Sequence, residues 1–185
     1  MNKQILSEMN DKNVASLIEA IEENYKDCQG SIFYKFPSIK EFGKNALQPD
    51  VLVISEKHGV IIIVADDMTT QREESWDDFI ERKDSIEISI YTGLLKNKNL
   101  KLNNRTLRFD IHTIGFCPNL LGDNKDENVY VSAERILSFM DSIIRSDTIP
   151  VNVLEEIVAS LESSSAIIKP KERICQIMRI QKQNC

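Results

Sequence analysis

The stretch from Gln48 to Asp67, QPDVLVISEKHGVIIIVADD, decides the fold that we predict for this chain. Four apolar residues, Val51 to Ile54, predict one strand, and the run from Val60 to Ala65 predicts the next. The segment between them ends in Gly59, which suits the positive φ of a tight reversal. Because the second run is apolar without alternation, we expect it in the middle of a sheet that is covered on both faces.

Helices and strands are predicted on both sides of this hairpin. A helix from about Asp11 to Lys26 and a strand from Ser31 to Phe36 precede it. After the hairpin we expect a helix over 75–96, strands over 109–116 and 128–131, a helix over 132–145, and two C-terminal helices that begin near Pro150 and Pro170. This order predicts an α/β fold with a central mixed sheet flanked by helices and a helical C-terminal appendage.

The composition is that of an ordinary globular protein. The chain has 185 residues, 42% of them hydrophobic and 28% charged, and its formal net charge is -6. This acidic balance gives nucleic-acid binding no support from overall charge. The four cysteines form no C-x-x-C pair, and no apolar run is long enough to cross a bilayer. We therefore expect a cytoplasmic protein without a zinc site and without a membrane partner.

The hairpin, which opens with Pro49-Asp50 and turns through His58-Gly59, resembles the core of the PD-(D/E)xK nucleases. The likeness is closest to the nuclease-related domain, NERD, and it covers roughly residues 11–140. It implies a restriction-endonuclease-like core in residues 1–146, followed by a helical extension in residues 147–185. In that family, two carboxylates on adjacent strands hold a divalent cation, and a lysine stabilises charge on the phosphate.

The sequence departs from the family pattern at two of the three catalytic positions. Asp50 matches the first acid, but the family spacing places the second acid at Val64 and the lysine at Asp66. An apolar side chain therefore stands where a metal ligand is needed, and an acid stands where a cation is needed. The resemblance implies a degenerate site, so we expect a non-enzymatic chain that needs no cofactor.

A rearranged catalytic site is the alternative. Asp50 could hold Mg²⁺ together with Asp66 or Asp67, provided that a cation from the helix around Arg82 and Lys83 replaces the lysine. By contrast, we expect His58, in a Lys-His-Gly turn, to be exposed and inert.

Two further segments bear on partners. Residues 84–111 look like the N-terminal region of bacterial UvrD-like DNA helicases, in which a nuclease-related domain precedes the motor. This implies a helicase motor domain, or another protein, as a partner. The connector after the long helix is basic and contains no acid, so it is a candidate DNA-binding surface. Its cationic residues are Lys96, Lys98, Lys101, Arg105 and Arg108.

Three functions follow from these patterns. We expect a catalytically degenerate nuclease-like domain that serves DNA processing by binding DNA or protein. The first alternative is an active Mg-dependent DNA nuclease built on Asp50, Asp66 and Asp67. The second is a protein-interaction module without nucleic-acid binding, for which the basic connector is only a solvated loop.

Overall fold

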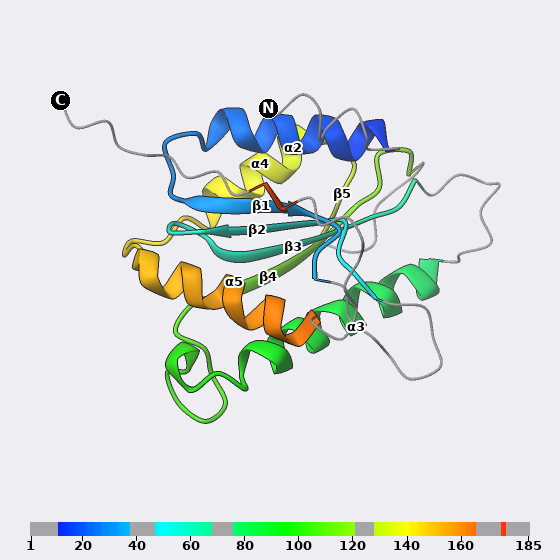
Figure 1. The fold of residues 1–185 in the computed structure, drawn as a ribbon. Coiled ribbons are helices and arrows are strands. Elements are labelled where there is room, and N and C mark those ends of the chain that lie inside the picture. The colour runs from blue at the N-terminus through cyan, green and yellow to red at the C-terminus, as the bar shows by residue number, and fades with distance from the viewer. Residues whose placement is uncertain (1–10, 38–46, 68–75, 121–127, 166–174, 177–185) are drawn as a thin grey trace.

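A mixed β-sheet between two layers of helices forms the body of the protein (Figure 1). The computed structural model describes residues 11–37, 47–67, 76–120, 128–165 and 175–176. In chain order the elements are α2 (Lys12–Asn24), β1 (Gly30–Tyr34), β2 (Val51–Ser55), β3 (Gly59–Ala65), α3 (Trp76–Leu94), the 3₁₀-helix η1 (Lys98–Leu100), β4 (Ile111–Phe116), β5 (Val129–Tyr130), α4 (Ala133–Ser142), α5 (Val151–Ser165) and β6 (Cys175–Gln176). The predicted α/β class, with helices flanking a mixed sheet, is confirmed.

The predicted hairpin is the pair β2–β3. Its two strands are antiparallel, with Val51 opposite Ile63 and Ser55 opposite Gly59. Gly59 has a φ of 78°, and a Cβ at this position would lie 2.4 Å from the carbonyl oxygen of Asp110. Only glycine therefore fits both the turn and the close approach of the chain before β4.

Strand β3 lies inside the sheet, as its unbroken apolar run predicts. The strand order is β5-β4-β3-β2-β1-β6, and β3 pairs with β4 in parallel. Val60, Ile62 and Val64 join a buried cluster with residues of α3 and α5. Ile61 and Ile63 join a second cluster with residues of α2 and α4. Because β3 contributes side chains to both clusters, the hairpin is the centre of both cores. Each such buried side chain stabilises the fold by about 1.5–3 kcal/mol.

The helices bury the faces that their spacing predicts. Helix α2 is capped by Asp11, whose Oδ1 accepts from the backbone N–H groups of Asn13 at 2.9 Å and Val14 at 3.2 Å. Ser132 caps α4 in the same way. The apolar residues that share one side of α3 are all buried, namely Phe79, Ile86, Ile90 and Leu94. None of the described helices is long and apolar enough to cross a membrane.

The C-terminal prediction is wrong at Cys175 and Gln176. We expected them in a basic helix, but they form β6, antiparallel to Ile32 and Phe33 of β1. Without β6 that side of β1 would be an open sheet edge, whose free N–H and C=O groups are a template for an extended segment. The rest of that expected helix lies outside the described residues. Helix α5 shares a buried cluster with α3, and the domain boundary after residue 146 stays a prediction.

Candidate functional site

A polar cleft opens where β2 begins and β3 ends. The antiparallel hairpin brings these two points together, because Asp50 donates its backbone N–H to the Ile63 carbonyl at 3.0 Å. Lys35, which follows β1, donates its own backbone N–H to the Asp50 carbonyl at 3.0 Å. The cleft has a volume of about 530 Å³, and the residues that line it are Asp11, Lys12, Asn13, Tyr34, Lys35, Asp50, Ala65, Asp66, Asp67, Arg82 and Asn119.

Asp50 is held by the end of the neighbouring strand. Its Oδ2 accepts from the backbone N–H of Ala65 at 2.7 Å and lies 3.9 Å from Nη1 of Arg82. The side chain is 21% exposed. Burial raises the pKa of the Asp50 carboxyl, and the Ala65 N–H and the charge of Arg82 only partly oppose that rise. Asp50 is therefore a carboxylate that is costly to keep ionised.

Asp66 is the more deeply buried of the two acids. Its side chain is 1% exposed, and its Oδ2 accepts from Nη2 of Arg82 at 3.3 Å. The same Nη2 lies 3.3 Å from the carbonyl oxygen of Ala65, to which it also donates. The guanidinium lies over the ring of Phe79, 5.5 Å from its centroid, which adds a cation–π contact. Arg82 thus connects α3 to the ends of both strands of the hairpin.

Val64 offers nothing to this cleft. It is fully buried and packs in the cluster with Leu52, Ile62 and Phe79. A site for Mg²⁺ needs several oxygen ligands, and a valine side chain supplies none. Within the described residues, no group of three or more His, Cys, Asp or Glu side chains could hold a metal ion. The arrangement of Asp50 and Asp66 therefore fits the guanidinium that already joins them better than it fits Mg²⁺.

The structure brings together all three acids predicted for the site. Asp50 and Asp66 meet at Arg82, and Asp67 lines the same cleft. Of the two cations predicted as substitutes for the lysine, Arg82 enters the cleft and Lys83 does not line it. Sequence reasoning missed Lys35 and Asn119, since nothing in their local patterns marks them and only the folded chain places them beside Asp50.

The basic set lies at the other end of β3. It sits in the connector before β4, and Ile111, the first residue of β4, pairs with Val60 at the start of β3. The acids lie beyond the last residue of β3, about 20 Å along a seven-residue strand. Nε of Arg108 donates to the Lys101 carbonyl at 2.8 Å, so Arg108 holds the shape of the connector. The structure therefore does not combine the basic set and the acids into one surface.

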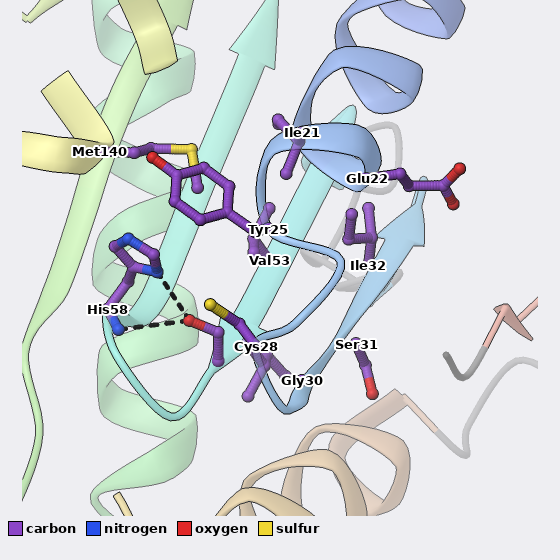
Figure 2. A pocket seen from close by; sticks show the side chains of 12 residues that line it. Ile21, Glu22, Tyr25, Cys28, Gly30, Ser31, Ile32, Val53, His58 and Met140 are labelled. Carbon is purple, nitrogen blue, oxygen red and sulfur yellow. Dashed lines mark hydrogen bonds between the residues drawn. The ribbon is translucent and has the colours of Figure 1, made fainter. Parts of the chain in front are cut away.

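A second, smaller pocket surrounds His58 (Figure 2). Its volume is about 30 Å³. His58 is 1% exposed, its Nδ1 lies 2.8 Å from the Ser55 hydroxyl, and the ring of Tyr25 packs edge-on against it at 4.9 Å. Our expectation of an exposed His58 is wrong, because the turn folds inward and the Ser55 hydroxyl pairs with one of the two ring nitrogens. Burial lowers the pKa of His58, which favours the neutral ring of a structural histidine.

The variant Asp50→Asn tests the electrostatics of the cleft. A carboxyl whose pKa is raised in the folded state binds a proton more readily there than in the unfolded chain. Stability then falls as the pH rises from the ordinary value of 3.8 through the raised folded-state pKa. Asparagine keeps an oxygen for the Ala65 N–H and removes the charge.

We therefore expect Asp50→Asn to be at least as stable as the wild type at neutral pH. Any advantage should shrink as the pH falls, and urea unfolding of both proteins from about pH 3 to about pH 7 measures it. The exposed Asp84→Asn is the matched control. If the variant is less stable than the wild type at neutral pH, and the difference in unfolding free energy disappears in acid, the pKa of Asp50 is lowered instead.

The cleft thus combines two acids, Asp50 and Asp66, and an arginine that joins them. Its chemistry has to be argued from these residues, because the chain matches no family model, no curated protein and no solved structure.

Proposed function

We propose that this chain is a catalytically degenerate nuclease-like module that acts in DNA processing by binding DNA or a protein such as a helicase motor. One observation carries the proposal. In the cleft at the end of the β2–β3 hairpin, Arg82 joins Asp50 and Asp66, the two acids between which an active nuclease would need a metal ion. Such a site would keep the arrangement of a nuclease site but would not catalyse phosphodiester hydrolysis.

The order of elements supports a restriction-endonuclease-like core. Helix α2 and strand β1 precede the β2–β3 hairpin, as the resemblance to the nuclease-related domain implies. Helix α3, the connector and β4 then follow in the order that the helicase-associated domains imply. Asp50 lies just before β2 and Asp66 just after β3, at the end of the hairpin where the resemblance implies a catalytic site.

The side chains of the cleft argue against hydrolysis. Metal-assisted cleavage needs a cation that polarises the phosphate and lowers the pKa of the attacking water. Here the Oδ2 atoms of Asp50 and Asp66 both face Arg82, and Val64 supplies no third ligand. A phosphodiester that entered this cleft would meet four aspartates, Asp11, Asp50, Asp66 and Asp67, whose negative charges oppose that of the phosphate.

Contact with DNA would therefore occur away from the cleft. The connector exposes Lys96, Lys98, Arg105 and Arg108, and Lys101 is half-buried. It is held in place by α5, because the side-chain amides of Asn97 and Asn99 donate to Oε1 of Glu156 at 3.0 Å and 2.7 Å. A basic loop with a fixed shape can follow a phosphate backbone at a small entropic cost.

Fluorescence anisotropy with single-stranded and duplex oligonucleotides tests DNA binding. We expect binding that weakens as salt rises, and no cleavage with Mg²⁺ or Mn²⁺. The double variant Lys98→Gln/Arg105→Gln should reduce the slope of log K against log salt by about 1–2, because each lost phosphate contact removes about 0.7–0.9.

Lys26→Gln/Arg135→Gln is the matched control, since it removes the same charge from two exposed positions. Lys26 lies just after α2 and Arg135 lies in α4, both far from the connector. Its slope should stay that of the wild type. No binding at low salt would favour the protein-interaction module. DNA cleavage that disappears in Asp50→Ala would show an active nuclease instead.

A further inference from the structure

Three oxygen atoms from the two strands of the hairpin surround the guanidinium of Arg82. Its Nη1 lies 3.9 Å from Oδ2 of Asp50. Its Nη2 lies 3.3 Å from Oδ2 of Asp66 and 3.3 Å from the carbonyl oxygen of Ala65. The guanidinium therefore lies within 4 Å of all three oxygens, with Nη1 nearest Asp50 and Nη2 nearest Asp66 and Ala65.

These oxygens are of the kinds that hard divalent cations bind. Carboxylate and backbone carbonyl oxygens are the usual protein ligands of Ca²⁺, and Mg²⁺ binds one or two carboxylates while it keeps several waters. The cleft of about 530 Å³ beside them has room for such waters. The positive charge and the bulk of Arg82 oppose the approach of a metal ion to these oxygens.

We infer that Arg82 is an internal cation in the place of a metal, and that its removal turns Asp50, Asp66 and the Ala65 carbonyl into a site for a divalent cation. This goes beyond the proposed function, because it concerns the cleft alone and requires no contact with DNA. The wild type then holds its acids together without a metal. Arg82 anchors α3 to the hairpin and blocks metal binding with the same side chain.

The test measures Mn²⁺ binding to the full chain. Electron paramagnetic resonance reports the concentration of free Mn²⁺, and thermal unfolding reports the change in Tm. The wild type should bind no Mn²⁺ at the cleft and should show no change in Tm. Arg82→Ala should bind one Mn²⁺, and its Tm should rise by about 2–5 °C when Mn²⁺ is present at roughly ten times its dissociation constant. Arg82→Ala/Asp66→Asn is the matched control and should lose that response.

Each outcome decides the inference. Mn²⁺ bound by the wild type in a manner that depends on Asp50 and Asp66 overturns it, and so does an Arg82→Ala protein with no response to Mn²⁺. If Arg82→Ala folds only when Mn²⁺ is added, the inference is supported, and failure to fold with or without Mn²⁺ counts against it. A wild type that fails to bind DNA would remove DNA binding from the proposed function and leave the inference standing.

Discussion

Replacing Arg82 by alanine is expected to destabilise the protein by about 3 kcal/mol in the absence of metal. Breaking a buried ion pair costs about 3–5 kcal/mol, because the remaining charge keeps its desolvation penalty. Asp66 is 1% exposed and loses the guanidinium of Arg82, which lies 3.3 Å from its Oδ2. Arg82 itself is 26% exposed, so solvent compensates for part of the loss and the lower end of the range applies. Urea unfolding measures the change.

Two variants separate this effect from the loss of a large side chain. Arg135→Ala removes an exposed arginine from α4 and should change the free energy of unfolding by less than about 0.5 kcal/mol. Arg82→Ala/Asp66→Asn removes the buried charge together with its partner and should recover a large part of the stability. A cost for Arg82→Ala as small as that of Arg135→Ala would mean that the ion pairs in the cleft contribute little.

Phe79→Ala is expected to cost about 3–5 kcal/mol, the range for a buried phenylalanine that leaves a cavity. Phe79 is fully buried, and its ring packs against Gly115 of β4. A Cβ at Gly115 would lie only 2.9 Å from Cζ of Phe79. The guanidinium of Arg82 lies over the same ring, and the ring of Trp76 packs against it with the two centroids 5.9 Å apart. Its loss should weaken the core and the cleft together.

Phe79→Leu keeps most of the apolar volume and should cost less than half as much, since a smaller cavity is left behind. Because Phe79 contacts Arg82, the double variant Phe79→Ala/Arg82→Ala should not show additive losses. Chemical denaturation of the two single variants and the double variant gives the coupling free energy. Strictly additive losses would contradict the account in which the ring positions the guanidinium.

The elements of the core were predictable because their signals are local. The apolar run from Val60 to Ala65 has no alternation, and the structure places it between two other strands. The apolar spacing along α3 predicts its buried face from Phe79 to Leu94. Asp11 and Ser132 are capping residues whose side-chain oxygens act within three residues of their own position. Signals of this kind need no knowledge of the tertiary structure.

The cleft was only partly predictable, because its partners come from distant parts of the chain. The spacing after Asp50 marks Val64 and Asp66, and the helix around Arg82 was a candidate source of a cation. That Arg82 enters the cleft and Lys83 does not line it depends on the rotation of α3 over the sheet. The prediction of an exposed His58 was wrong because a turn residue is usually exposed. The Ser55 hydroxyl comes within hydrogen-bond distance of its Nδ1 only when the turn folds inward.

A crystal structure of the wild type grown with MnCl₂ tests the central claim most directly, because manganese is visible by anomalous scattering. The account predicts that the guanidinium of Arg82 stays between Asp50 and Asp66 and that no anomalous peak appears there. A manganese ion ligated by Asp50 and Asp66, with the side chain of Arg82 displaced, would contradict it and would favour an active metal-dependent nuclease.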